Sequence, residues 1–146
     1  MKIHKRGLEG VGDALAYLLT LFPCWFIAKW GSPKLALLWL IALVAQIALV
    51  YLLKFIFNST SWGTRPGGDG LAFPSAHTSN SFFGAMWMFT AAAFPDDLSK
   101  IWISLLWFIL AAIVAYSRVI AMRHHVRDVI VGAILGIAIA FLALQF

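Results

Sequence analysis

Residues 35–57 read LALLWLIALVAQIALVYLLKFIF, an apolar stretch interrupted only by Gln46 and, near its end, by Lys54. About 20 apolar residues in an α-helix are enough to cross the hydrocarbon core of a bilayer. Backbone polar groups cannot stay without hydrogen bonds in lipid, and a helix satisfies them within its own segment. This stretch therefore predicts a membrane-spanning helix that is long enough to cross with some tilt. We expect Gln46 to form a hydrogen bond to a neighbouring helix.

The rest of the chain has the same apolar character. Of its 146 residues, 62% are hydrophobic and 12% are charged, and its mean hydropathy is +0.90. A water-soluble domain of this size has too much surface to hide so much apolar area. The composition thus excludes a soluble domain and predicts an integral membrane protein with one domain, residues 1–146. The net charge of +5 suits anionic lipid head groups, and we expect the lipid bilayer, not nucleic acid, as a partner.

Four further apolar segments cover residues 14–30, 76–94, 101–116 and 129–146. All five segments are expected to be helices, which gives an all-α bundle of about five transmembrane helices. Gly132 and Gly136 permit a close approach between two of them. Residues 1–12 are basic and contain three glycines, and we expect them to form a short interfacial segment before a retained first helix, not a cleavable signal.

Two polar loops, 58–75 and 117–127, follow the second and fourth apolar segments. Two membrane crossings separate these loops, so both should emerge on the same face of the membrane. Lys54, Arg65 and Arg118 would then lie near Ser75, which is a candidate N-cap for the third helix. A helix N-terminus and several cations together suit an anion with the geometry of phosphate. We infer a phosphate ligand, carried by a lipid that enters from the bilayer.

Two histidines, one in the second loop and one just after the first, have different neighbours. Asp128 follows His124 by four residues, so a helix continuing past Met122 would hold both side chains on one face. A carboxylate in this position can orient an imidazole and make it a better nucleophile. His77 lies at a helix start with no carboxylate in its own segment, and one histidine could attack phosphorus while the other donates a proton. Two histidines and a carboxylate could also ligate zinc, but the three cations nearby disfavour a divalent ion, and we expect no metal and no other cofactor.

Three motifs carry a family resemblance: Arg65-Pro66, Pro74-Ser75-Ala76-His77 and Ser117-Arg118-x5-His124-x3-Asp128. They resemble the signature motifs of the type 2 phosphatidic acid phosphatase family, whose site is shared with vanadium-dependent haloperoxidases. The resemblance covers residues 54–128 and implies a metal-independent phosphatase that works through a phosphohistidine. It implies that His124 is the nucleophile, that Asp128 orients it, and that His77 is the general acid and then the base. The phosphoryl oxygens would be held by Lys54, Arg65, Ser75, Ala76 and Arg118.

The chain departs from the family pattern in three places. Lys54 precedes Arg65 by eleven positions where the family usually has seven, so it is either a displaced phosphate ligand or a residue that snorkels to the membrane surface. Ala76 stands where glycine is common, and five helices replace the six of many members. His125 is expected to be an interfacial or packing residue. Arg123 and Arg127 either contact the lipid head group or interact with the anionic surface.

Undecaprenyl diphosphate is the substrate that we favour, because a site with little extramembrane protein can hardly read a large head group. Phosphatidic acid, phosphatidylglycerol phosphate and lipid A phosphate are the alternatives. An anion channel or transporter is the alternative from another class, and a silent lipid-binding relative is a third. By resemblance, we expect a bacterial inner-membrane protein with its site facing the periplasm. The basic residues near the N-terminus instead favour the cytoplasmic side.

Overall fold

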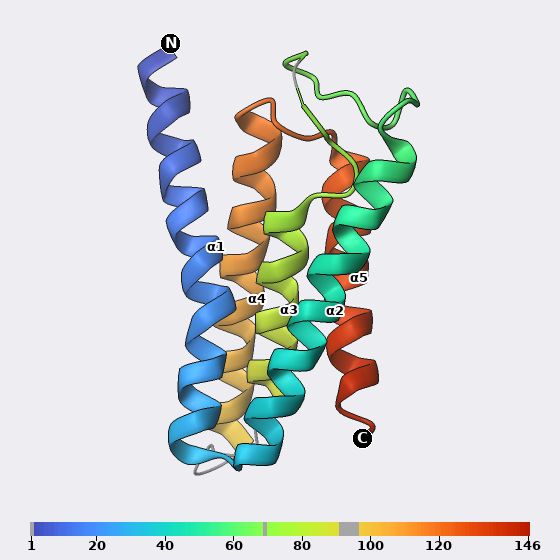
Figure 1. Cartoon of the computed structure of the whole chain (residues 1–146). Coiled ribbons are helices and arrows are strands. Elements are labelled where there is room, and N and C mark those ends of the chain that lie inside the picture. The colour runs from blue at the N-terminus through green and yellow to red at the C-terminus, as the bar shows by residue number, and fades with distance from the viewer. Residues whose placement is uncertain (1, 69, 91–96) are drawn as a thin grey trace.

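The computed structural model of this chain describes residues 2–68, 70–90 and 97–146. Five helices follow one another in this part of the chain (Figure 1): α1 (Lys2–Trp30), α2 (Pro33–Phe57), α3 (Ala76–Thr90), α4 (Asp97–Ile120) and α5 (Val126–Ala143). The β-structure among the described residues is limited to one isolated bridge between Thr64 and Leu71. The predicted all-α bundle is confirmed.

Four of these helices are long and apolar enough to cross a membrane, over Gly7–Lys29, Pro33–Phe57, Leu98–Ile120 and Val126–Ala143. Large apolar side chains such as Leu37, Phe55 and Ile130 point outward and are more than half exposed, as expected for surfaces that face lipid. The chain is therefore a multi-pass membrane protein. α3 is described as far as Thr90, and residues 91–94 of the predicted third segment lie outside the described residues.

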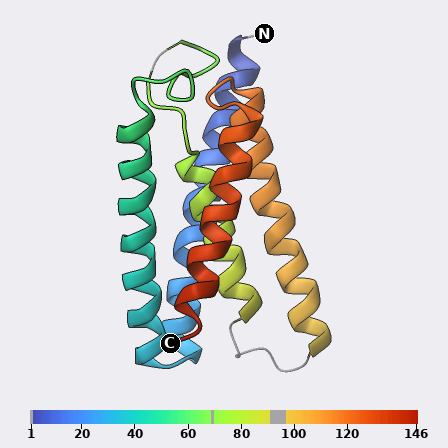
Figure 2. The same ribbon diagram turned by 90° about the vertical axis from the view of Figure 1, so that its right-hand side faces the viewer.

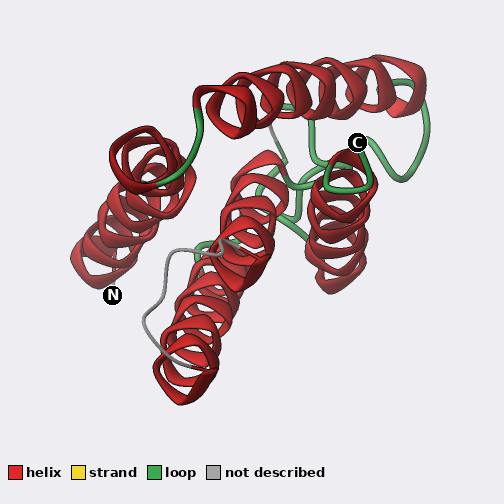
Figure 3. Cartoon of the chain, turned by 90° about the horizontal axis from the view of Figure 1, so that it is seen from below, coloured by secondary structure: helices red, strands yellow, loops and turns green. Residues whose placement is uncertain are grey.

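α3 runs through the middle of the bundle and contacts each of the other four helices (Figure 3). Its contact with α5 is close because glycines of α5 face its backbone: a Cβ atom at Gly132 would lie 2.6 Å from the Ser75 carbonyl oxygen, and one at Gly136 would collide with the Ser79 carbonyl oxygen. Gln46 of α2 donates hydrogen bonds to Ser79 Oγ at 3.0 Å and Asn80 Oδ1 at 2.9 Å. Both expectations, the close glycine approach and the interhelical Gln46 contact, are confirmed.

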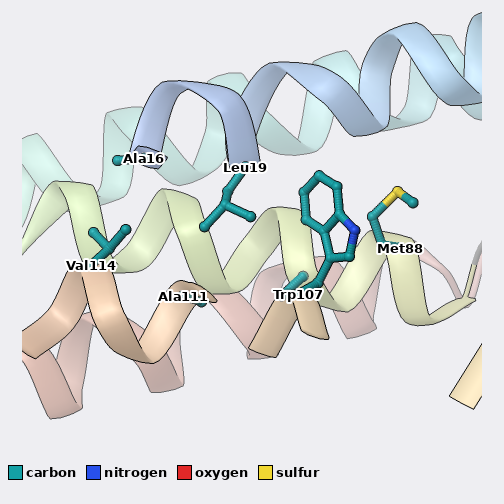
Figure 4. Packing of buried hydrophobic residues seen from close by; sticks show 7 residues of the cluster. Ala16, Leu19, Met88, Trp107, Ala111 and Val114 are labelled. Carbon is teal, nitrogen blue, oxygen red and sulfur yellow. The ribbon is translucent and has the colours of Figure 1, made fainter. Parts of the chain in front are cut away.

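An apolar core joins α1, α3 and α4 below the polar end of the bundle (Figure 4). Its buried members are Ala16, Leu19, Ala85, Met88, Trp107, Ala111 and Val114. The small residues let the three helices approach, while the indole of Trp107 fills the space toward the opposite end. This packing holds the middle of α1 against α3 and α4.

The N-terminal segment differs from the prediction. Residues 1–12 were expected to form a short interfacial segment before the first helix, but α1 begins at Lys2 and continues without a break to Trp30. The physical reason is packing: a Cβ atom at Gly12 would overlap Ser117 Oγ and Arg118 Nη2, so glycine lets α1 lie directly on the end of α4. The glycines of this segment do not end the helix, and the segment forms the first turns of α1.

The polar segments gather at one end of the bundle (Figures 1 and 2). The N-terminus, loop 58–75 and the connection between α4 and α5 lie together there, and the C-terminus lies at the other end. The Gly67 amide donates a hydrogen bond of 3.2 Å to the Met122 carbonyl and so joins the two loops. The shared face that the helix count predicted is present in the structure.

Candidate active site

A cavity of about 340 Å³ opens at this polar end of the bundle. Four of the residues that the sequence motifs predicted line it: Arg65 from the long loop, His77 from the first turn of α3, Arg118 from the last turn of α4, and His124 from the α4–α5 connection. The other residues lining the cavity are Glu9, Asp13, Tyr17 and Arg123. Residues far apart in sequence thus form one site rich in positive charge.

His124 is held in a tight turn after α4. The carbonyl oxygen of Arg118 accepts hydrogen bonds from the Arg123 and His124 amides, at 3.0 and 3.3 Å, and Met122 takes a positive φ of 58° that reverses the chain. The side chain is buried, with 5% of the residue exposed. Burial, followed by the positive charges of Lys54 and Arg65, lowers the pKa of His124 from 6.5 to about 3. The imidazole is therefore neutral at physiological pH, with a lone pair available.

Asp128 lies behind His124 at the third position of α5, completely buried. Its Oδ2 accepts a hydrogen bond of 2.8 Å from the His125 amide and lies 3.7 Å from His124 Nδ1. That distance is longer than a hydrogen bond, and within the described chain both His124 Nδ1 and Asp128 Oδ1 are buried without a hydrogen-bond partner. The two groups are close enough to pair after a small rotation of either side chain.

The helix past Met122 that would hold this pair on one face does not form, although the two side chains are close. α4 ends at Ile120 and α5 begins at Val126, so His124 precedes the helix that carries Asp128. His125 is the N-cap residue, and its backbone and the Asp128 carboxylate form a capping box. A cap interaction, not a continuous helical face, brings the carboxylate to the histidine.

Arg118 is almost fully buried and is bound by α1. Its Nη1 lies 2.5 Å from Asp13 Oδ1, and its Nη2 donates a 2.8 Å hydrogen bond to the Glu9 carbonyl oxygen. Arg123 pairs with the Glu9 carboxylate, with 2.6 Å between Nε and Oε1. The wall of the cavity formed by α1 therefore carries negative charge opposite the arginines.

His77 also contacts α1. Its Nε2 lies 3.1 Å from Asp13 Oδ1, and its ring meets Tyr17 edge to face, with 6.2 Å between the ring centroids. The side chains of His77 and Asp13 are 35% and 39% exposed, so both can reach water. The carboxylate that His77 lacks in its own segment comes from another helix.

Lys54 does not line the cavity. Its side chain is buried, and Nζ donates to the carbonyl oxygens of Leu71 at 3.3 Å and Ala72 at 3.1 Å. Arg65 Nε donates to the same Leu71 oxygen at 3.3 Å. Lys54 therefore points inward and holds the long loop near Arg65, and does not extend to the membrane surface as a snorkelling lysine would.

Ser75 and Ala76 lie at the start of α3, below the cavity. The Ser75 amide donates to the Asp128 carbonyl oxygen at 3.0 Å, and its hydroxyl lies 3.0 Å from Thr78 Oγ1 and 3.5 Å from the Thr78 amide. Ser75 is completely buried. It caps α3, as predicted, and it ties α3 to α5.

A second cavity, of about 210 Å³, begins at His77 and Tyr17 and runs between α1, α2 and α3. Its lining is mainly apolar and includes Ala16, Val50 and Ala76. Because His77 and Tyr17 line both cavities, a molecule with a polar head and an apolar chain could occupy the two at once.

The arginines after the site have structural partners. Arg127 Nη2 donates to the Ser61 carbonyl oxygen at 2.9 Å, and its guanidinium lies 4.9 Å from the centroid of the Trp62 ring. It also lies near Asp128, with 3.6 Å between Nε and Oδ1. Arg127 thus connects the long loop to α5. Of these two arginines, Arg123 lines the cavity and Arg127 does not.

Sequence reasoning missed Glu9, Asp13 and Tyr17. A signal was present, because Glu9 and Asp13 are spaced four residues apart and a helix would put both on one face. Acidic side chains in a candidate membrane helix are costly unless they have partners. The expectation that residues 1–12 form an interfacial segment before the first helix separated Glu9 from Asp13 and so hid this signal.

Comparisons with known proteins find relatives of this chain. A “Probable lipid phosphate phosphatase beta” from Arabidopsis thaliana is 31% identical over 134 residues, covering 73% of this chain and 63% of the relative. A “Probable diacylglycerol pyrophosphate phosphatase 1” from Schizosaccharomyces pombe is 36% identical over 91 residues, covering 57% of this chain and 33% of the relative. The chain therefore spans less than two thirds of the length of either relative.

Among solved structures, the crystal structure of Aquifex aeolicus LpxE is similar, with a TM-score of 0.70 and 26% identity. The match covers 95% of this chain and 86% of that one. The sequence pattern of the PAP2 superfamily matches residues 35–146, a range that holds every predicted site residue. With its motifs gathered around one cavity and this match over most of its length, the chain belongs to the PAP2 superfamily.

Proposed function

We propose that this protein is a lipid phosphate phosphatase, which hydrolyses a phosphate ester or anhydride on a membrane lipid through a phosphohistidine. The observation that carries the proposal is the cavity in which a neutral, buried His124 lies with His77 and two arginines, Arg65 and Arg118. Guanidinium groups match the oxygens of a phosphoryl group, and a neutral imidazole can attack phosphorus. The position at one end of a membrane bundle favours a substrate held in the bilayer.

In the first step, His124 Nε2 attacks phosphorus and the bond to the departing oxygen breaks. Nδ1 is turned toward Asp128, which leaves Nε2 for the substrate. As the P–N bond forms, the ring gains positive charge, and the Asp128 carboxylate would stabilise that charge and fix the ring orientation. His77 gives a proton to the departing oxygen.

In the second step, His77, now neutral, takes a proton from a water molecule that attacks the phosphohistidine. The P–N bond breaks, inorganic phosphate leaves and His124 is restored. Both steps balance with side chains and water alone, so the proposed reaction needs no metal and no other cofactor.

Arg65 and Arg118 are proposed to hold the phosphoryl oxygens, because both line the cavity. Lys54 would add positive charge from beneath, provided that Nζ exchanges a carbonyl partner for a phosphoryl oxygen. Ser75 and Ala76 would act through the N-terminus of α3, whose dipole favours an anion. The Ser75 amide is already bonded to Asp128, so a direct contact from Ser75 would have to come from its hydroxyl.

Undecaprenyl diphosphate is the substrate that we propose, ahead of phosphatidic acid, phosphatidylglycerol phosphate and lipid A phosphate. The apolar cavity between α1, α2 and α3 is small, about 210 Å³, which suits one chain better than several. One relative is named for a pyrophosphate lipid, which also supports an anhydride substrate. Few residues around the cavity are placed to contact a larger head group.

The test is phosphate release from these four lipids by detergent-purified protein and by its His124→Ala variant. We expect release by the unaltered protein, fastest from undecaprenyl diphosphate, and none by the variant, which should keep its elution volume and melting temperature. Undiminished release by His124→Ala would remove the nucleophile assignment. A tenfold preference for phosphatidic acid would overturn the choice of lipid. Ion flux through protein-containing liposomes without phosphate release would favour the anion channel instead.

We also propose that the protein lies in a bacterial inner membrane with its site facing the periplasm. The C-terminus lies at the end opposite to the site (Figure 1), so it should then be cytoplasmic. A reporter that is active only in the cytoplasm, fused after Phe146, should give signal. A silent fusion in a stable, expressed protein would place the site in the cytoplasm, as the basic residues near the N-terminus favour.

A further inference from the structure

Asp13 has no part in the steps above, yet it touches two groups that do. Its Oδ1 lies 3.1 Å from His77 Nε2 and 2.5 Å from Arg118 Nη1. The family match begins at residue 35, so α1 and its carboxylates lie outside the part of the chain that carries the family motifs. The contact therefore adds to the site a group from a helix that the motifs do not include.

Tight packing fixes the backbone around Asp13. At Gly12 the helix lies on Ser117 and Arg118 of α4, with no room for a Cβ atom. Further along α1, the Leu19 carbonyl oxygen lies where a Cβ atom of Gly84 in α3 would be. Since Asp13 lies between these two close crossings, its carboxylate is held beside Arg118 at the end of α4 and His77 at the start of α3.

The two imidazoles of the site have different electrostatic surroundings. Arg118 of α4, Lys54 of α2 and Arg65 of the long loop act on both His77 and His124 with positive charge. Burial and these cations lower the pKa of His77, and the negative charge of Asp13 on α1, with Oδ1 3.1 Å from His77 Nε2, opposes them. A carboxylate this close favours the charged imidazolium against the surrounding cations, which is the form that a general acid must have before the reaction.

We infer that Asp13 is the positioning carboxylate of His77, which orients the imidazole and favours its protonated form so that His77 can protonate the departing oxygen. The inference rests on the proposed function. An imidazolium has two N–H groups: Nε2–H stays on Asp13, while Nδ1–H goes to the departing oxygen and is restored from the attacking water. Asp13 exchanges no proton in these steps.

The test compares two substrates in the Asp13→Asn variant. The leaving group of phosphatidic acid is a diacylglycerol alkoxide, which is poor and needs the acid, whereas that of p-nitrophenyl phosphate is a stable phenolate that hardly needs it. We expect kcat to fall about 10- to 100-fold for phosphatidic acid, less than the ~10²–10⁴-fold of a whole acid catalyst, with little change for p-nitrophenyl phosphate. For phosphatidic acid, the alkaline limb of the pH–rate profile should move to lower pH, because the imidazolium has lost its partner.

Glu9→Gln is the matched control, because Glu9 lies one turn away on the same face and pairs with Arg123, not with His77. Glu9→Gln should change kcat for phosphatidic acid and kcat for p-nitrophenyl phosphate to the same extent. In the His77→Ala background, Asp13→Asn should cause no further loss for phosphatidic acid, since the group that it serves is gone. Asp13→Glu keeps the charge, so its loss should be smaller than that of Asp13→Asn at equal melting temperature.

Three results would overturn the inference. Equal losses on both substrates with a raised KM would mean that Asp13 only holds Arg118. If the losses of His77→Ala and Asp13→Asn added up in the double variant, Asp13 would likewise only hold Arg118. Unchanged kcat for phosphatidic acid in a folded Asp13→Asn protein would leave Asp13 without a role. If the unaltered protein releases phosphate from none of the four lipids named under the proposed function, the proposed function itself fails, and this outcome is separate from the other three.

Discussion

The site contains two carboxylate–histidine pairs that are built in different ways. His124 and Asp128 are neighbours in sequence at the α4–α5 corner, and their side chains are 6% and 0% exposed. His77 and Asp13 come from different helices, and their side chains are 35% and 39% exposed. The first pair depends on a turn and a helix cap, whereas the second exists only because α1 packs on α3 and α4. A local pair can be read from spacing, and a distant pair cannot.

The difference in exposure fits the two proposed roles. A nucleophile must be neutral, and burial keeps the His124 pKa at about 3. A general acid must regain its proton in each turnover, which requires access to water. Because one pair is buried and the other is partly exposed, one histidine can act as the nucleophile and the other as the general acid.

The buried pair should be the more sensitive of the two. Asp128→Asn removes the charge that steadies the His124 ring, and we expect kcat to fall about 10²- to 10⁴-fold, as when the carboxylate of a catalytic triad is neutralised. The measurement is phosphate release at saturating lipid. Since Asp128 also caps α5, the variant must be shown to be folded. A loss smaller than that of Asp13→Asn would reverse the comparison between the pairs.

The distant pair should break when α1 is pushed away. A Cβ atom at Gly12 would overlap Ser117 and Arg118, so Gly12→Ala should destabilise the protein by about 1–3 kcal/mol. It should also lower turnover about tenfold or more, because small displacements of catalytic groups are costly.

Gly10→Ala is the control for this change, because nothing lies within 4 Å of a Cβ atom at Gly10. It should be neutral or slightly stabilising, since alanine favours helix over glycine. Melting temperature and turnover measured together would check both variants. Equal effects at the two positions would mean that the packing of α1 does not support the site.

The low pKa of His124 in the buried pair should also make the stability of the protein depend on pH. The folded-state pKa of His124, about 3, lies below its ordinary value of 6.5. As pH falls from about 6.5 to 3, the unfolded chain takes up a proton that the folded one does not, so stability is lost in this window and is fully present above it. His124→Asn removes this term, and its melting temperature should fall less steeply between pH 6.5 and 4. Parallel curves for the two proteins would show that His124 titrates normally.

Chelation should have the smallest effect. The described residues contain no group of three histidine, cysteine, aspartate or glutamate side chains arranged to hold a metal ion, and the proposed steps use none. We expect phosphate release to be unchanged after incubation with EDTA and dialysis. A loss that zinc or magnesium restores would contradict the view that each carboxylate serves a histidine.

Much of this arrangement was predictable because it is local. Apolar length predicts each membrane helix, and the count of crossings predicts that Arg65, Arg118 and His124 share one end. The proximity of His124 and Asp128 follows from their spacing, although the helix expected between them is a turn and a cap. Lys54 shows the limit: spacing left open whether it snorkels, and the carbonyl oxygens of Leu71 and Ala72 keep it buried.

The sequence by itself determined the membrane bundle, the face on which its polar residues gather, and the local pair of His124 and Asp128. These follow from hydrophobic length, chain direction and short-range geometry, which need no knowledge of neighbouring helices. Only the tertiary structure decided that α1 starts at Lys2 and brings Asp13 to His77 and Arg118. That contact depends on whether the surface at Gly12 fits Ser117 and Arg118 of another helix, and such a fit between distant surfaces is a property of packing, which no local pattern encodes.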